Sequence, residues 1–214
     1  MLVEVAQEIR RLSARHGGLP ADTGPTGPPR RILEAALGLF AEKGFAGASI
    51  RDIATAAGVR SATLYAHYGA KEQILADLVL IGHQDHHARL RAAVVGNDPA
   101  ATLAALVDAH VRWHAEHPRL AIVANAELHA LSVELGAESL ALRDASTELL
   151  VGVIRDGTAR GVFAPADVWM AAAAIGGMGI RVANWFAPDS DYSVDDVAAA
   201  YSDFALCIAR GTSA

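Results

Sequence analysis

A short run of polar and aromatic side chains between residues 60 and 71 has the composition of a surface that contacts nucleic acid. Short or polar side chains on the outer face of a helix let its backbone approach the major groove, where hydroxyl and guanidinium groups reach base edges and phosphates. Tyr68 and Lys71 stand where a further helix begins, which is a favourable place for a phosphate. The alternative is an ordinary helical hairpin whose polar side chains are solvated. The run consists of Arg60, Ser61, Thr63, Tyr65, His67, Tyr68 and Lys71.

Nine histidines raise the question of a metal site. His83 and His87 are four residues apart, as are His110 and His114, and this spacing on a helix can present two imidazoles to one ion. No cysteine accompanies either pair, and histidine pairs at this spacing commonly occur on helices that bind no metal. We therefore expect no metal site and no cofactor.

The chain carries no recognisable catalytic motif. It has no phosphate-cradling glycine loop, no HExxH and no GxSxG sequence, and the glycines at 176–179 stand within a predicted helix rather than after a strand. Spacing alone does not show whether Ser132 or Cys207 lies beside a histidine. We expect that the protein is not an enzyme.

Helical periodicity dominates the chain from Arg30 onward, and strand signals are nearly absent. The first predicted helix stops at Gly44. Ser49 caps the second, with Asp52 three residues later as in a capping box, and that helix ends at Gly58. Ser61 caps a third, short helix. Three such helices with a glycine in the last turn predict a helix-turn-helix unit over residues 30–75.

Longer helices follow, and the whole chain is predicted to be all-α. We place these helices near 71–95, 100–116, 119–134, 137–160, 166–187 and 194–210, with prolines at several of the breaks. Residues 1–16 carry a short amphipathic pattern, and residues 17–29 are rich in proline and glycine, which is typical of a flexible linker. Three parts are therefore expected: an extension and linker at 1–29, the helix-turn-helix unit at 30–75, and a larger helical domain at 76–214.

The charge distribution supports this division. The net charge of the 214 residues is -6, which argues against nucleic acid as a partner. Residues 28–75, however, hold six basic and four acidic side chains, whereas residues 76–214 hold nine and seventeen. The longest apolar stretch, residues 168–180, is too short to cross a bilayer, and the single cysteine fits a reducing compartment. We expect a cytoplasmic protein without a membrane partner.

Residues 30–75 resemble the DNA-binding domain of the tetracycline-repressor (TetR) family. The resemblance implies a homodimer that binds a palindromic operator on double-stranded DNA, usually as a repressor that a small ligand releases. It assigns DNA contacts to Arg51, Arg60, Ser61, Thr63, Tyr65, Tyr68 and Lys71. Phe40, Ile53 and Leu64 would hold the three helices together. The positions that carry the resemblance are Ala35, Phe40, Gly44, Ser49, Ile53, Ala54, Gly58, Val59, Leu64, Tyr65, Tyr68, Lys71 and Glu72.

The C-terminal half is similar, more weakly, to a subgroup that regulates fatty-acid and sterol degradation. Its effectors are acyl-CoA thioesters, so the resemblance implies a small lipophilic effector, with an acyl-CoA as one candidate. An apolar cavity with a few convergent polar groups is the usual pattern of a ligand site. The candidate ligand-binding residues are His110, Trp113, His114, Glu127, His129, Arg181 and Trp185.

Small residues at 171–179 and an apolar face at 194–208 predict a pair of helices that forms a dimer interface. The alternative is that the same two helices pair within one chain. Two other functional classes also stay open. One is a DNA-binding protein without an effector, which a core without a cavity would favour. The other is a small-molecule-binding helical protein whose N-terminal domain contacts another protein.

Overall fold

The computed structural model describes residues 17–211, and the regular secondary structure in this range is all helical, which confirms the all-α prediction. The amphipathic pattern of residues 1–16 lies outside the described residues. In chain order the elements are α2 (Pro28–Gly47), α3 (Ile50–Ala56), α4 (Ser61–His67), α5 (Lys71–Ala93), α6 (Pro99–Glu116), α7 (Pro118–Ala126), the 3-10 turn η1 (Leu128–Ala130), α8 (Val133–Ala159), α9 (Val168–Trp185) and α10 (Val194–Arg210).

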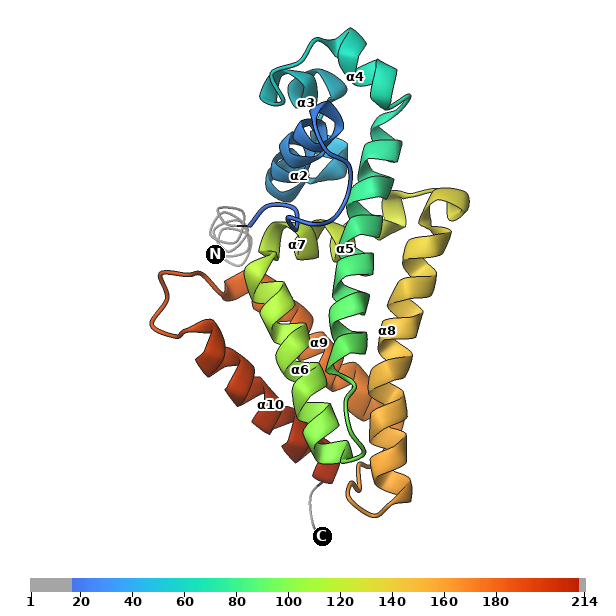
Figure 1. Ribbon diagram of the computed structural model, residues 1–214, viewed down its shortest axis with the longest axis vertical. Helices are drawn as coiled ribbons and strands as arrows, with labels where there is room; N and C mark the ends of the chain where they lie inside the picture. Colours follow the sequence, from blue (N-terminus) through green and yellow to red (C-terminus); the bar gives the residue numbers. More distant parts are fainter. Residues whose placement is uncertain (1–16, 212–214) are drawn as a thin grey trace.

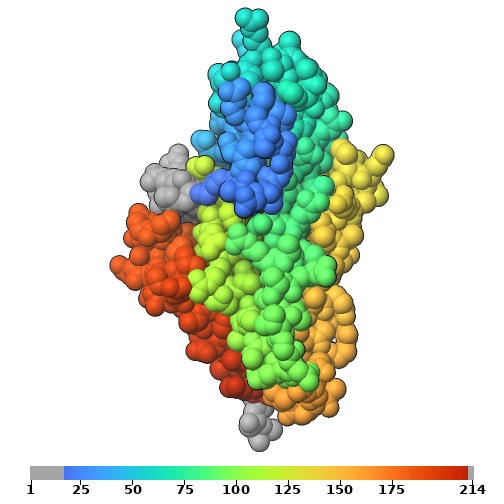
Figure 2. Space-filling view, viewed as in Figure 1, coloured from blue at the N-terminus to red at the C-terminus, as the bar shows by residue number. Residues whose placement is uncertain are grey.

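The helix-turn-helix unit forms one end of the molecule and the longer helices form the rest. Figure 1 shows α2, α3 and α4 together at this end, with α5 running from it along α8. In the space-filling view, α8 and α10 form opposite edges of the larger part (Figure 2). Because α5 is continuous from residue 71 to 93, the expected domain boundary at 75/76 falls inside one helix. The three-part division of the chain stays a prediction.

Local sequence signals explain the helix-turn-helix unit. The Ser49 side chain accepts from the Asp52 N–H at 3.1 Å, and Asp52 accepts from the Ser49 N–H at 3.2 Å, so the predicted capping box is present. Gly44 leaves the helical conformation with φ of 74°, although α2 continues for one more turn. Ser61 does not cap α4: it is the first helical residue, and Arg60 is the N-cap.

The apolar faces of the three helices meet in a closed core, as predicted. Phe40 of α2, Ile53 of α3 and Leu64 of α4 are each at most 2% exposed. Burial of a side chain of this size contributes about 1.5–3 kcal/mol to folding. These three residues therefore hold the helices together and leave the opposite face of α4 free.

Two expectations about the chain path are wrong. The helix expected at 119–134 ends at Ala126: Glu127 makes the last helical bond, to the Val123 carbonyl, the 3-10 turn η1 follows, and the Ser132 N–H donates to the Glu72 carboxylate of α5. The segment expected to be a flexible linker packs on the protein in its described part: Leu19 is buried in the core, and the Arg30 guanidinium donates to the carbonyls of Leu19, Pro20 and Thr23.

The packing of the two last helices differs in part from the expectation. On α10, Val197, Ala198, Ala205 and Ala209 are buried within the same chain, largely against α6. This face of α10 is thus buried mainly against α6 and not against α9, so the intrachain pairing of the two last helices is not the main contact, and the exposed Phe204 lies on another face of α10. Among the described helices, none is both long and apolar enough to cross a membrane.

Candidate DNA-binding surface and internal cavity

The outer surface of α3 and α4 carries six of the eight predicted DNA contacts. Their side chains are exposed, and Tyr65 keeps 56% of its surface in solvent. Leu64 anchors α4 from the opposite side, so the helix presents a polar face to the outside. The six residues are Arg51 on α3 and Arg60, Ser61, Thr63, Tyr65 and His67 at or within α4.

The other two predicted contacts have partners inside the protein. The Tyr68 ring is buried, and its hydroxyl donates to the Asp77 carboxylate of α5 at 3.1 Å. Burial and this carboxylate raise the pKa of the Tyr68 hydroxyl, and burial raises the pKa of Asp77. The Lys71 ammonium donates to the carbonyls of Phe45 and Ala48 at 2.6 and 2.7 Å. Both side chains thus join α5 to the helix-turn-helix unit, which sequence spacing did not indicate.

Phe45 is held from two sides. Its carbonyl accepts from Lys71, whose ammonium also lies 4.2 Å from the centre of the Phe45 ring, a cation–π contact. Its N–H donates to the Glu127 carboxylate at 3.2 Å. Lys71 begins α5 and Glu127 follows α7, so two helices of the larger part fix one residue of the DNA-binding part.

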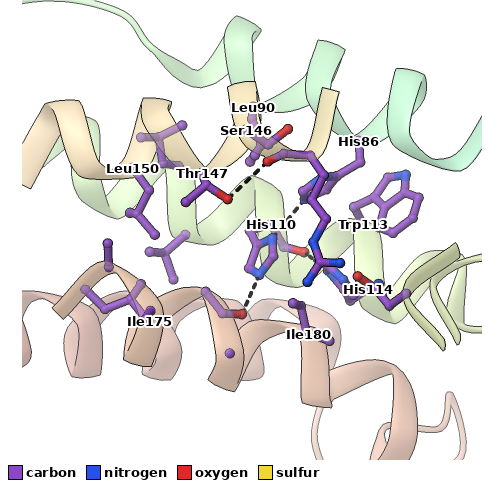
Figure 3. A pocket seen from close by; sticks show the side chains of 18 of the residues that line it. His86, Leu90, His110, Trp113, His114, Ser146, Thr147, Leu150, Ile175 and Ile180 are labelled. Carbon is purple, nitrogen blue, oxygen red and sulfur yellow. Dashed lines mark hydrogen bonds between the residues drawn. The ribbon is translucent and has the colours of Figure 1, made fainter. Parts of the chain in front are cut away.

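The larger part encloses a cavity of about 320 Å³, within the usual size range of small-molecule sites. Five helices line it: α5, α6, α7, α8 and α9. Figure 3 shows Leu150 and Ile175 at one end and His86, Trp113 and His114 at the other, with His110 between them. Arg143 also lines the cavity and is largely exposed, so it supplies a positive charge at the rim. The cavity is therefore apolar at one end and polar at the other.

A hydrogen-bonded chain of histidines forms the polar end. The His86 Nε2 and His110 Nδ1 atoms are 2.8 Å apart, and His110 Nε2 lies 3.0 Å from the Gly176 carbonyl of α9. Burial and the neighbouring imidazoles hold the pKa of His86 and of His114 well below the ordinary value, and burial also lowers the pKa of His110. Burial therefore favours the neutral form of all three imidazoles.

Three of the seven predicted ligand residues line this cavity: His110, Trp113 and His114. The other four do not. Glu127 bonds to Phe45, and His129, Arg181 and Trp185 are exposed. Glu127 and His129 lie beyond the end of α7, and Arg181 and Trp185 lie on a face of α9 that does not line the cavity.

Sequence reasoning missed several lining residues. Among them are His86, Arg143, Ser146 and Thr147. The sequence could have indicated His86, because His83, His86 and Leu90 recur at helical spacing and therefore share one face of α5. His87, which was paired with His83 by spacing, bonds instead to Ser146 at 3.0 Å.

Comparison with known families and proteins agrees with this architecture. Residues 32–78 match the bacterial regulatory proteins of the tetR family, and residues 96–209 match a tetracyclin repressor-like C-terminal domain. The chain is 32% identical over 192 residues to the HTH-type transcriptional repressor KstR2 of Rhodococcus jostii (strain RHA1), covering 87% of this chain and 94% of that protein.

Solved structures show the same fold. A bacterial regulatory protein in the tetR family from Rhodococcus RHA1 superposes with a TM-score of 0.82 and 32% identity, covering 89% of this chain and 100% of that one. The structure of AibR in complex with isovaleryl coenzyme A and operator DNA gives a TM-score of 0.75 at 24% identity, covering 83% and 97%, and supports the fold alone. With an exposed recognition helix and matches along both halves, the chain belongs to the TetR family of DNA-binding transcriptional repressors and is not an enzyme.

Proposed function

We propose that the protein is a homodimeric repressor that binds a palindromic operator and is released by a small lipophilic effector. The observation that supports the effector is the cavity among α5 to α9, with its apolar end and its histidine-lined end. An unfilled cavity lowers the stability of the folded protein. We therefore expect a DNA-binding protein that binds no effector to fill this volume with side chains.

The proposed reading surface is the exposed face of α3 and α4, without Tyr68 and Lys71. Arg60 at the start of α4 is placed to reach a phosphate or a base edge. We expect Arg60→Ala to weaken operator binding and to reduce the slope of log affinity against log salt by about 1 if the contact is to a phosphate. Arg155→Ala is the control, because Arg155 lies exposed on α8 and its replacement removes the same charge. If the Arg60 variant bound operator DNA as tightly as the wild type, the start of α4 would not contact DNA as proposed.

The proposed dimer interface is the outer face of α9 together with Phe204 of α10. Exposed residues recur on α9 at spacings of four and seven, and most of them are apolar or small: Met170, Ala174, Arg181 and Trp185. Trp185 stacks on Tyr201, which in turn contacts Phe204, so the two helices share a continuous aromatic surface. Two such faces about a two-fold axis would bury one another and set the spacing of two recognition helices.

Sedimentation equilibrium tests this interface. A charge at an interface core is costly when it is desolvated, so we expect Phe204→Asp to sediment as a monomer and to lose tight operator binding. Val133→Asp places the same charge at a 92%-exposed residue at the start of α8 and should stay dimeric. A Phe204 variant that is still a stable dimer would exclude this face.

The proposed effector places an apolar body against Leu150 and Ile175 and a polar group near the histidines and Arg143. An acyl thioester fits this polarity, and AibR is described in complex with isovaleryl coenzyme A. A whole coenzyme A is far larger than about 320 Å³, so only the acyl end would occupy the cavity, and the nucleotide would extend past its rim.

Release of operator DNA by acyl-CoAs of increasing chain length, with the free acids in parallel, tests the effector class. Leu150→Trp should fill the apolar end and abolish release while operator binding persists. Leu149→Trp is the matched control, because Leu149 is adjacent on α8 and outside the cavity lining. If effector released operator DNA equally well from both variants, the effector would bind outside this cavity. If no acyl-CoA or other lipophilic compound released the operator from the wild type, an effector-independent regulator would be favoured.

The proposed switch acts through Phe45. Both α5 and α7 line the cavity, and both hold Phe45, through Lys71 and Glu127 respectively. Gly82 lets them approach closely, since a methyl group there would come within 3.1 Å of Ala124. An effector that moves α5 against α7 would redirect the helix-turn-helix unit. It can shift the balance only by its difference in affinity for the two states.

A further inference from the structure

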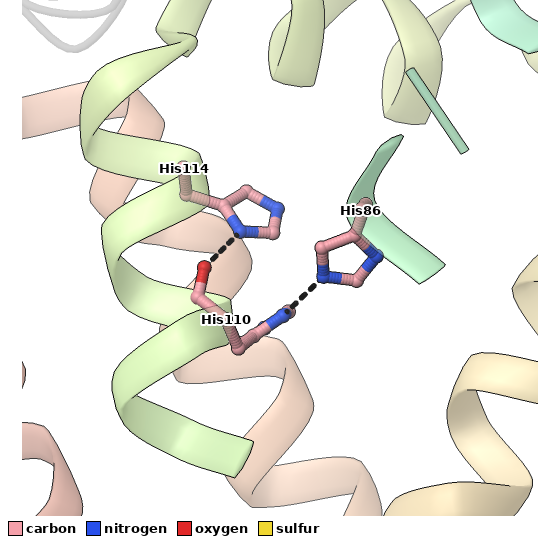
Figure 4. Close-up of side chains that lie close together, drawn as sticks. All are labelled: His86, His110 and His114. Atoms are coloured by element: carbon pink, nitrogen blue, oxygen red, sulfur yellow. Dashed lines mark hydrogen bonds between the residues drawn. The ribbon is translucent and has the colours of Figure 1, made fainter. Parts of the chain in front are cut away.

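Three imidazoles from two helices converge at the polar end of the cavity. His110 and His114 are four residues apart on α6, and His86 faces them from α5 (Figure 4). One nitrogen from each ring lies within 4.8 Å of the nitrogens of the other two, and all three are buried. The histidine pairs identified from their four-residue spacing included His110 and His114 but not His86.

Backbone carbonyls fix two of the three rings. Since a carbonyl only accepts, His110 must carry its proton on Nε2 to bond Gly176, which leaves the Nδ1 lone pair free to face His86. By the same reasoning, His114 carries its proton on Nδ1, 2.8 Å from the His110 carbonyl. Its Nε2 lone pair is fully buried and has no hydrogen-bond partner among the described residues.

This is the arrangement that metal-binding histidines adopt. A ligating imidazole usually donates its other N–H to a backbone carbonyl or carboxylate, which fixes the tautomer and the ring plane. Here the two carbonyl bonds leave one unprotonated nitrogen on His110, which lies 2.8 Å from His86 Nε2, and one on His114, which is buried without a partner among the described residues. A buried acceptor without a partner destabilises the folded protein, and a cation is one partner that would remove this cost.

A tetrahedral ion requires the three rings to adjust. Zinc lies about 2.0–2.1 Å from imidazole nitrogens, which places two such ligands about 3.3 Å apart in a tetrahedron. The 2.8 Å between His86 Nε2 and His110 Nδ1 would have to widen, and the longer separations within the 4.8 Å cluster would have to shorten, by rotation of the side chains. His86 would also transfer its Nε2 proton to its own Nδ1 through water, with no net proton released.

We propose that His86, His110 and His114 bind one divalent transition-metal ion of the zinc class, with a fourth coordination position open to the cavity. Neutral nitrogen ligands suit Zn²⁺, Co²⁺, Ni²⁺ and Cu²⁺ and disfavour Ca²⁺ and Mg²⁺. The bonds to backbone carbonyls already leave an unprotonated nitrogen on His110 and on His114, so these two ligands need no deprotonation. This proposal differs from our expectation, made from spacing, of no metal site.

The fourth position would take water or a donor atom of the effector, so this part of the proposal rests on the proposed effector cavity. The three-histidine site itself does not. Metal binding is therefore measured first on the whole chain without DNA or effector, and its result stands whichever compound, if any, releases the operator.

The experiment uses protein stripped with a chelator and then titrated with Zn²⁺ by calorimetry and with Co²⁺ by visible absorption. We expect one ion per chain and the intense visible bands of tetrahedral Co²⁺. His86→Gln and His114→Gln should each weaken binding at least 100-fold. His87→Gln is the control on α5, because His87 bonds to Ser146 outside the cluster, and it should bind as tightly as the wild type.

X-ray absorption at the zinc edge of the wild type gives a second measurement that needs no variant to fold. Three imidazole ligands are expected. The proposal fails if the stripped wild type binds no Zn²⁺ at micromolar concentration, which would show a metal-free hydrogen-bonded cluster. It fails equally if the cluster variants bind as tightly as the wild type, or if the edge spectrum shows fewer than three imidazoles.

Discussion

The close approach of α9 to the His110 ring gives a sharp test of the cavity geometry. Gly179 has no side chain, and a methyl group there would overlap with His110. We predict that Gly179→Ala destabilises the protein, although alanine favours a helix. Gly152→Ala in α8 is the matched control, because no atom lies within 4 Å of the methyl group it would add.

The magnitude follows from two opposing terms. Replacing glycine by alanine inside a helix stabilises it by about 1 kcal/mol, and this applies to both variants. Overpacking a core costs about 1–3 kcal/mol and applies only to Gly179→Ala. The free energies of unfolding should therefore differ by about 1–3 kcal/mol between the variants. For a domain of this size, that corresponds to roughly 2–12 °C in Tm.

Thermal and urea unfolding, at one protein concentration and with a chelator present, measure this difference. Fixed concentration matters because dimerisation shifts the apparent stability. Adding His110→Ala to Gly179→Ala should recover most of the overpacking cost, seen as a coupling energy in the double-mutant cycle. If Gly179→Ala is as stable as Gly152→Ala, or the cycle shows no coupling, then His110 does not pack against residue 179.

Three further predictions concern the junction between the two parts. Glu127→Ala removes the bond to the Phe45 N–H, so operator binding should persist while its release by effector weakens, as measured by fluorescence anisotropy. Lys71→Met should weaken operator binding by loosening that junction but leave its salt slope unchanged; a slope smaller by about 1 would instead show a phosphate contact. Burial raises the pKa of Asp77, so its charged form is disfavoured in the folded state above the ordinary carboxyl pKa. Asp77→Asn keeps an acceptor for Tyr68 and should raise the free energy of unfolding at pH 7, with the gain shrinking as the pH falls toward about 4; a loss at pH 7 would contradict this.

The helix-turn-helix unit could be predicted from sequence because its signals are local. The capping box at Ser49, the glycine turn at Gly58 and the apolar spacing of α2 are all set within a few residues. The roles of Tyr68 and Lys71 were not predicted by this reasoning. The sequence places both where they could contact a phosphate, but their partners depend on the tertiary structure. Tyr68 bonds to Asp77 across a turn, and Lys71 bonds to two carbonyls at the end of α2.

The sequence predicted that an apolar cavity with a few polar groups exists, but not which residues line it. Periodicity indicates which residues share a helix face, and it placed His110, Trp113 and His114 together on α6. It does not tell how neighbouring helices are rotated about their axes, and this rotation brings His86 to the cavity while Arg181 and Trp185 point outward. Glu127 was wrongly assigned to the cavity for a different reason, since the helix was expected to continue past it.

The small residues of α9 act on two faces of the helix rather than one. As predicted from their size, small side chains allow close approach, and the described residues show this on the inner face. Gly176 and Gly179 lie there, where one carbonyl holds His110 and one missing side chain admits its ring. Ala174 is exposed on the opposite face, within the proposed dimer surface. Because both faces belong to one helix, a shift of α9 that accommodates a cavity ligand must also displace the dimer surface. The proposed effector site and the spacing of the two recognition helices are therefore connected through α9 as well as through Phe45.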